Sequence, residues 1–416
     1  MHPLHLDLRG RRVLVAGGGP GAAGCARRLA EAGADVLVVA EALCEELREL
    51  RAAGRVRVRR GSAGPADLQD AWLVHAATGD AREDEALAVL AEQRRVWCVR
   101  PGDAAAGTAV EPAVVRRDDV VVSVTAGGTG AGSSAGTGTG LDAERARVLA
   151  GALGHRLDSG ELPLRRRRPH PGRVVLVGGG PGEPELLTLR GRRRLAEADV
   201  VVVDRLAPTG VLTELDPDVE VVDVGKAAGN HPVPQEEINR VLVEAALAGR
   251  TVVRLKGGDP YVLGRGGEEV LACREAGVEV EVVPGVTSAF AVPAAAGIPV
   301  THRGAARCVT VLSGHEDLAG DDLEALARLD GTLVVLMGVS ALERLSAALV
   351  AAGRDPGTPV AVVEDGWSPR QRTTTAPLGE IAAVARAAGV RPPAVVVVGE
   401  VIEALGARGV SAAAGA

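Results

Sequence analysis

Short runs of Val and Leu recur along the chain and alternate with glycine turns and helix-forming stretches. The run RRVLVAGGGPGAAGCARRLAEAGADVLVVA opens the first half, and RVVLVGGGPGEPELLTLRGRRRLAEADVVVVD opens the second at Arg173. Each has the pattern of a strand, a glycine turn, a helix and another apolar strand. Strands that are apolar throughout and alternate with helices indicate a parallel sheet buried on both faces. The pattern therefore predicts an α/β protein whose first domain is Rossmann-like.

The second half continues as alternating strands and helices. Its apolar runs predict strands at residues 173–178, 200–204, 219–223, 251–255, 279–283, 308–313, 332–336, 359–363 and 394–398. Two turn-rich segments, VVPGVTS at residues 282–288 and GIPVTHRG at residues 297–304, interrupt this pattern. We therefore expect two α/β subdomains that meet near residues 285–300, with a ligand in the cleft between them.

A low-complexity stretch separates the two halves. Residues 126–140 read AGGTGAGSSAGTGTG, which offers too little apolar surface to pack, and a basic run, Arg165–Pro171, follows. Between these stretches, residues 142–153 predict one helix. The expected organisation is a Rossmann-like domain at 1–125, a linker at 126–171, and two α/β subdomains at 172–288 and 289–416.

Composition narrows the class of protein. The 416 residues are enough for about two or three domains. A net charge of −7 argues against general nucleic-acid binding. Five scattered cysteines without CxxC spacing are typical of reduced thiols, and the histidines show no metal-ligand spacing, so no metal site is predicted. The first residues lack an apolar signal core and no apolar run reaches ~18 residues, so we expect a cytoplasmic protein without a membrane span.

The first half carries a candidate dinucleotide site. Gly17, Gly19 and Ala22 form a GxGxxA pattern between a predicted strand and a predicted helix. Such glycines let a backbone approach a pyrophosphate that rests on the helix N-terminus. Glu41 follows the next strand, where an acidic side chain meets a ribose hydroxyl. The alternative is a tight turn in a vestigial domain.

Lysine usage points to the second half. Of 47 basic residues only Lys226 and Lys256 are lysines, so each occupies a position that arginine has not taken over. Lys256 is followed by Gly257, Gly258 and Asp259 at the end of a predicted strand, where open α/β sheets bind ligands. The alternative is a strand-to-helix turn that Asp259 caps.

Several segments of the second half resemble the tetrapyrrole methylase family, and uroporphyrinogen-III C-methyltransferases in particular. They are VVLVGGGPGEPELLTLRG, VVVDRL, VGKAAGNHPVPQEEIN, VVRLKGGDPYVLGRGGEE, VVPGVTSAFAVPAAAGIPVTHRG, TLVVLMGV and VAVVEDGWSPRQR, in family order from about Arg173 to Glu403. The chain as a whole resembles the siroheme synthase family. That resemblance implies methylation of uroporphyrinogen III to precorrin-2 by S-adenosyl-L-methionine, then oxidation of precorrin-2 with NAD and insertion of Fe²⁺ by the first domain.

The resemblance also implies roles for individual residues. Asp204 takes the proton-acceptor position and Lys226 the proton-donor position of the methyltransferase. The S-adenosyl-L-methionine site would consist of Pro181, Gly257, Gly258, Asp259, Val262, Thr287, Ser288, Met337 and Gly366. Taken without the resemblance, Asp204 is an ordinary cap or ion-pair partner and Met337 is core packing. Because the substrate carries many carboxylates, Arg205, Arg254 and Arg265 are candidates to bind them.

The first half departs from the family pattern. Where the family has a catalytic Asp, a gapless comparison places Gly102, with Asp103 beside it as the candidate replacement. The glycine-serine run replaces a segment that in the family helps to form the dimer and the tetrapyrrole pocket. A methyltransferase with a vestigial or NAD-sensing first domain is therefore the alternative function, and a homodimer is the expected assembly.

Overall fold

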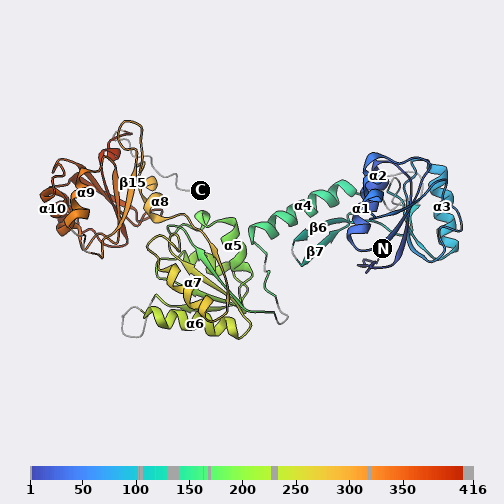
Figure 1. Cartoon of the computed structure of the whole chain (residues 1–416), viewed down its shortest axis with the longest axis horizontal. Helices are drawn as coiled ribbons and strands as arrows, with labels where there is room; N and C mark the ends of the chain where they lie inside the picture. The colour runs from blue at the N-terminus through green and yellow to red at the C-terminus, as the bar shows by residue number, and fades with distance from the viewer. Residues whose placement is uncertain are drawn as a thin grey trace. The chain divides into compact units, whose positions relative to one another are not determined.

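The computed structural model describes residues 2–101, 103, 106–117, 119–128, 140–162, 164–166, 170–225, 233–316, 318 and 320–405. The chain divides into two compact units, Met1–Gly154 and His155–Ala416 (Figure 1). Both units are α/β, as the sequence predicts. No helix within the described ranges is long and apolar enough to cross a membrane.

The first unit is built on a five-stranded parallel sheet in the order β3-β2-β1-β4-β5. Its strands are β1 Arg12–Ala16, β2 Asp35–Val39, β3 Arg57–Arg59, β4 Ala71–Ala76 and β5 Trp97–Val99, and its helices are α1 Pro20–Glu31, α2 Glu45–Ala52 and α3 Ala81–Gln93. Apolar side chains fill both faces of the sheet, in one cluster that includes α1 and another that includes α3. The strand order reverses between β1 and β4, which is where doubly wound sheets bind their ligands.

A hairpin and a helix follow this sheet. They comprise β6 Ala113–Arg117 and β7 Val120–Val124, the short pair β8 Gly127–Gly128 and β9 Gly140–Leu141, and α4 Ala143–Ser159. The helix predicted at residues 142–153 thus extends to Ser159. Most of the glycine-serine run, residues 129–139, lies outside the described residues.

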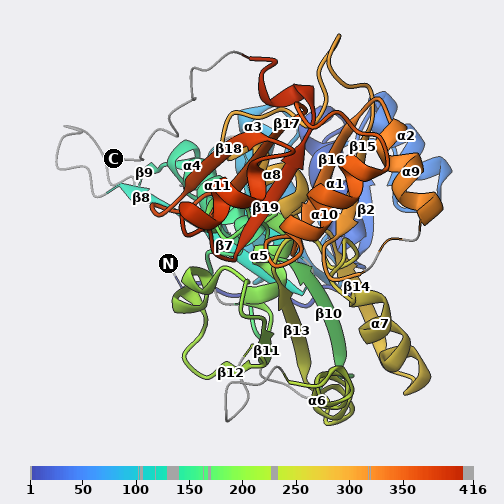
Figure 2. The same cartoon turned by 90° about the vertical axis from the view of Figure 1, so that its left-hand side faces the viewer.

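The second unit begins with another parallel sheet, in the order β12-β11-β13-β10-β14. Figure 2 shows β10, β13 and β11 side by side. The strands are β10 Arg173–Gly178, β11 Val200–Val203, β12 Glu220–Asp223, β13 Thr251–Lys256 and β14 Glu279–Val283; the helices are η2 Pro184–Leu186, α5 Leu189–Ala196, η3 Thr209–Glu214, α6 Gln235–Leu247 and α7 Gly266–Glu275. Valines and leucines of β10, β11 and β13 face two separate apolar clusters, so the sheet is buried on both sides.

A mixed sheet completes the second unit, in the order β15-β16-β19-β17-β18. Its elements are α8 Ser288–Ala295, β15 Val309–Ser313, α9 Gly320–Arg328, β16 Thr332–Leu336, α10 Leu342–Ala351, β17 Pro359–Glu364, β18 Arg372–Pro377, α11 Ile381–Ala387, β19 Ala394–Val398 and η4 Glu400–Ile402. Every strand predicted in the second half is present, within about one residue of its expected ends. Strand β18 was not predicted, because its sequence RTTTAP has no apolar run.

Candidate active site

Three glycine turns meet at the carboxyl ends of β10, β13 and β14. Gly180 and Gly258 pair through two backbone hydrogen bonds, with N···O distances of 3.1 and 2.7 Å. A Cβ on Gly178 would lie 2.5 Å from the backbone nitrogen of Gly285, and a Cβ on Gly285 would lie 2.3 Å from the carbonyl oxygen of Gly258. Only glycine fits at these positions, so the sheet edge presents backbone in place of side chains.

The carboxylate of Asp259 links two of these turns by hydrogen bonds. Its Oδ2 accepts a hydrogen bond from the backbone nitrogen of Gly285 at 3.0 Å, and its Oδ1 accepts one from that of Tyr261 at 2.8 Å. The predicted cofactor residues of this region lie along the same edge and at the start of α8: Gly257, Gly258, Asp259, Val262, Thr287 and Ser288. Asp259 is not the N-cap of α7, which is Arg265, so the alternative of a simple helix cap is wrong; its carboxylate instead joins its own turn to the turn at Gly285.

The remaining predicted cofactor residues come from more distant segments. Pro181 follows β10 in the glycine turn, and Met337 follows β16 with a φ of 57° and 39% of its surface exposed. Gly366 packs on α8, because a Cβ there would lie 2.7 Å from Val292. An exposed methionine held in the left-handed region is unusual for core packing, and this favours a ligand contact.

The candidate proton acceptor belongs to a buried ionic network. Asp204 follows β11, and its Oδ1 accepts a hydrogen bond from Arg254 Nη2 at 2.5 Å. Arg254 Nε and Lys256 Nζ both donate to Glu269 Oε1, at 2.9 and 3.1 Å, and Lys256 Nζ lies 3.9 Å from Asp204 Oδ2. Arg254, Lys256 and Glu269 are buried, whereas 31% of the Asp204 side chain is exposed. Among the described members of this network, Asp204 is therefore the one that a substrate can reach.

The charges of this network explain its arrangement. Burial lowers the pKa of Lys256, and the neighbouring Arg254 lowers it further. Burial also acts to lower the pKa of Arg254, but Asp204 and Glu269 outweigh it and raise that pKa. Arg254 consequently stays charged and holds Asp204 in place.

This geometry corrects one sequence-based expectation. Arg254 was a candidate to bind substrate carboxylates, but it is buried and already paired with two carboxylates. Arg205 and Arg265 are exposed, although Arg265 is paired with Glu268 on its own helix. Lys226, the candidate proton donor, lies outside the described residues. Glu269 was missed, because an acidic residue in the first turn of a helix looks like an ordinary partner of the helix dipole.

The first unit presents its own glycine turn between β1 and α1. A Cβ on Gly17 would lie 2.0 Å from the carbonyl oxygen of Ala77, and one on Gly18 would lie 1.7 Å from that of Ala42, whereas one on Gly19 would meet nothing within 4 Å. Gly19 is also the N-cap of α1. The turn is thus packed tightly against the protein on one side and open at the helix N-terminus, which fits a pyrophosphate.

The other predicted residues of the first unit lie around the same edge of its sheet. Ala22 is buried in α1, and Glu41 is exposed just after β2. Asp103 is exposed in a turn after β5, where its backbone nitrogen donates to the carbonyl of Arg100 at 3.1 Å. Gly102 lies outside the described residues. This edge of the sheet therefore carries the glycine turn and two exposed carboxylates, one after β2 and one after β5, with β1 and β4 between these strands.

Comparison with known protein families divides the chain in the same way. Residues 173–382 match the family described as Tetrapyrrole (Corrin/Porphyrin) Methylases, and residues 4–113 match one described as "Putative NAD(P)-binding". A siroheme synthase from Chromobacterium violaceum is 39% identical, with 96% of this chain and 95% of that protein covered. An S-adenosyl-L-methionine-dependent uroporphyrinogen III methyltransferase from Methanosarcina barkeri is 52% identical over 56% of this chain and 92% of that protein.

Solved structures resemble rather more than half of this chain. A cobalt precorrin-4 methyltransferase is 28% identical, with a TM-score of 0.50 and coverage of 55% of this chain and 95% of that chain. A uroporphyrin-III C-methyl transferase from Thermus thermophilus, complexed with S-adenyl homocysteine, is 48% identical, with a TM-score of 0.48 and coverage of 56% and 100%.

Proposed function

This chain belongs to the siroheme synthase family, and from that premise we propose that it converts uroporphyrinogen III towards siroheme. The second unit methylates uroporphyrinogen III to precorrin-2 with S-adenosyl-L-methionine. The first unit binds NAD, oxidises precorrin-2 to sirohydrochlorin and inserts Fe²⁺, which is a substrate of this last step.

The contact between the glycine turns and the loop after Asp204 is the observation that most directly supports a methyltransferase activity. A Cβ on Gly257 would lie 2.8 Å from the carbonyl oxygen of Leu206, and one on Gly179 would lie 2.4 Å from Pro208. The backbone edge that suits a cofactor therefore adjoins the exposed carboxylate. Methyl transfer to a pyrrole carbon, followed by loss of a proton from the ring system, needs both parts at one place.

The chain's own groups then have distinct tasks. S-adenosyl-L-methionine supplies a methyl group already activated on sulfur. The glycine turns hold the cofactor against the tetrapyrrole, so catalysis depends mainly on positioning. Arg254 occupies Asp204 Oδ1, which leaves Oδ2 to accept the proton that the tetrapyrrole ring system must lose after methylation. Lys226 is the proposed donor of the proton that completes the double-bond rearrangement.

In the first unit, too, separate residues bind the cofactor and accept the proton. The turn at Gly17 and Gly19 would hold the pyrophosphate of NAD and Glu41 would bind a ribose hydroxyl, and the chemistry that NAD would supply here is acceptance of a hydride. Oxidation of precorrin-2 removes two hydrogens, so a proton must leave with the hydride. Asp103 is the proposed acceptor of that proton.

Asp204→Asn tests the role of the second unit. We expect turnover of uroporphyrinogen III to fall by about 10²–10⁴-fold, with little change in the affinity for S-adenosyl-L-methionine. Asp321→Asn, on the exposed start of α9, is the matched control and should retain full activity. Unchanged turnover in the Asp204 variant would remove this residue from the mechanism.

The family resemblance also supports a homodimer and a cytoplasmic location. Sedimentation equilibrium of the purified chain tests the first point, because a single species with the mass of one chain would contradict it. Cell fractionation tests the second.

A further inference from the structure

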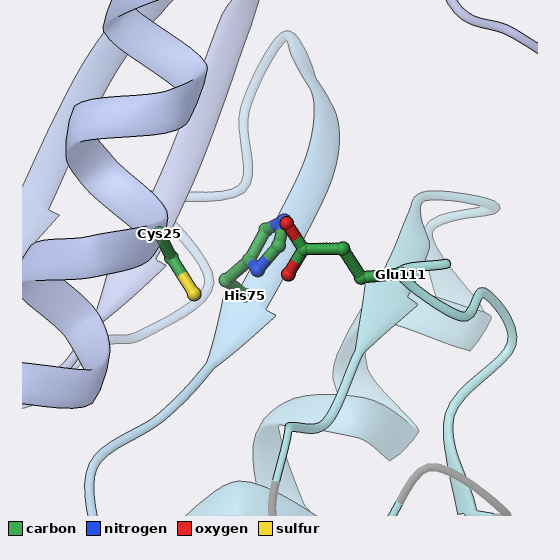
Figure 3. A group of neighbouring side chains, drawn as sticks. All are labelled: Cys25, His75 and Glu111. Atoms are coloured by element: carbon green, nitrogen blue, oxygen red, sulfur yellow. The ribbon is translucent and has the colours of Figure 1, made fainter. Parts of the chain in front are cut away.

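Three side chains with metal-ligating atoms converge in the first unit, outside the residues proposed for catalysis (Figure 3). Cys25 comes from α1, His75 from β4, and Glu111 from the segment before β6. One ligand atom from each lies within 4.8 Å of the others. The three residues come from a helix, a strand and a loop, so no spacing along the sequence indicated the group.

One nitrogen of the His75 imidazole is buried without a hydrogen-bond partner in the described part of the chain. His75 lies beside Val15 in the sheet, and only 2% of its surface is exposed. Its Nδ1 is buried and has no hydrogen-bond partner among the described residues. Burial of a polar atom costs free energy unless a partner compensates for it, so this nitrogen has an unmet requirement for one.

Arg28 organises the other two members of the group. Its Nε and Nη2 donate to the two carboxylate oxygens of Glu111, each at 2.8 Å, and its Nη2 lies 3.5 Å from Cys25 Sγ. A guanidinium in this position orients the carboxylate and partly offsets the burial that raises the pKa of the Cys25 thiol. Cys25 is 4% exposed, whereas 37% of the Glu111 side chain is exposed, so an ion has access from solvent on one side.

We propose that Cys25, His75 and Glu111 form a binding site for a divalent transition-metal ion. One sulfur, one nitrogen and one oxygen donor suit an ion of intermediate softness such as Zn²⁺ or Co²⁺. Three protein ligands leave a fourth tetrahedral position open for water or another ligand. Ligand atoms around such an ion lie roughly 3.3–3.8 Å apart, so small side-chain rotations complete the site. On binding, the Cys25 thiol gives up its proton to solvent and forms the sulfur–metal bond.

Cobalt titration tests this site in the full chain, which should carry no histidine tag. The protein is freed of metal with EDTA and titrated anaerobically with Co²⁺, whose bond to a thiolate produces a near-ultraviolet charge-transfer absorption band. We expect one saturable Co²⁺ per chain, displaced by Zn²⁺, and a melting temperature that rises when Zn²⁺ is added. Cys25→Ser should abolish the band, and His75→Gln and Glu111→Gln should each weaken Co²⁺ binding by about tenfold or more.

Matched controls exclude other thiols and imidazoles. Cys44→Ser, at the N-cap of α2, and His155→Gln, on α4, should bind Co²⁺ as the parent protein does. The proposal is overturned if no band saturates, if the band survives in Cys25→Ser, or if it disappears in Cys44→Ser. Should the Cys25 or His75 variant fail to fold, the exposed position of Glu111 keeps the test decisive, because unchanged affinity in Glu111→Gln also overturns the site.

Discussion

Replacement of Glu269 by Gln removes a charge from the centre of the second unit and preserves the shape of the side chain. Glu269 is fully buried on α7 and accepts hydrogen bonds from Arg254 and Lys256, which are 1% and 3% exposed. In the parent protein two cations face two carboxylates. In the variant only Asp204 opposes the two cations, so one positive charge stays buried without a partner.

The expected loss follows from that imbalance. Removal of one partner from a buried ion pair costs about 3–5 kcal/mol, because the remaining charge stays desolvated. For a unit of this size, each kcal/mol lowers the melting temperature by about 2–4 °C. Glu269→Gln should therefore lower the melting temperature of the second unit by about 6–20 °C.

Thermal unfolding of the full chain, followed by calorimetry, measures this loss. Glu268→Gln is the matched control, because Glu268 is the neighbouring residue on α7 and its ion pair with Arg265 is exposed to solvent. A second variant, Lys256→Met, removes a buried cation, so combining it with Glu269→Gln restores the balance of charge. We expect the double variant to be more stable than Glu269→Gln alone. The reasoning is refuted if Glu269→Gln has the same melting temperature as the Glu268→Gln control. It is also refuted if adding Lys256→Met does not raise the melting temperature of Glu269→Gln.

Gly285→Ala should abolish binding of S-adenosyl-L-methionine in a calorimetric titration, because the added Cβ would lie 2.3 Å from the Gly258 carbonyl oxygen. Gly267→Ala is the matched control and should bind S-adenosyl-L-methionine normally, because its Cβ would meet nothing within 4 Å. Equal affinities would contradict the assignment of this edge. Gly19→Val should weaken NAD binding without lowering the melting temperature, since the position is open and its backbone is extended; unaltered NAD affinity would argue against the turn. Burial raises the pKa of Cys273 from 9.0 to about 11, so the folded state retains a proton that the unfolded state releases. The free energy of unfolding should therefore fall as the pH rises from 9 towards 11, and it should fall less steeply in Cys273→Ala; parallel pH profiles would contradict this.

The fold was largely predictable from the sequence, because strands buried on both faces are continuous apolar runs that no surface helix resembles. Strand β18 shows the limit of that signal. It lies at the edge of its sheet, where its described pairing is with β17, and most of its side chains are exposed, so its sequence RTTTAP contains no apolar run.

The site was only partly predictable. Glycine turns and strand ends are local features, and they indicated correctly where backbone segments come into close contact. That this edge binds the cofactor stays a prediction. The network around Asp204 depends on long-range contacts that join β11, β13 and α7. Lys256 was conspicuous because lysine is rare in this chain, but its burial against Glu269 could be known only from the structure. The group of Cys25, His75 and Glu111 could not be predicted from the sequence either, because its members are far apart along the chain and meet only in the folded structure.

One experiment tests the central claim most directly. The purified chain is incubated anaerobically with uroporphyrinogen III and S-adenosyl-L-methionine, with and without NAD, and the masses of the tetrapyrroles are measured by mass spectrometry. We predict a dimethylated product that loses two further hydrogens only when NAD is present. A dimethylated product indifferent to NAD would favour a vestigial or NAD-sensing first unit, and the absence of methylation would contradict the proposed function altogether.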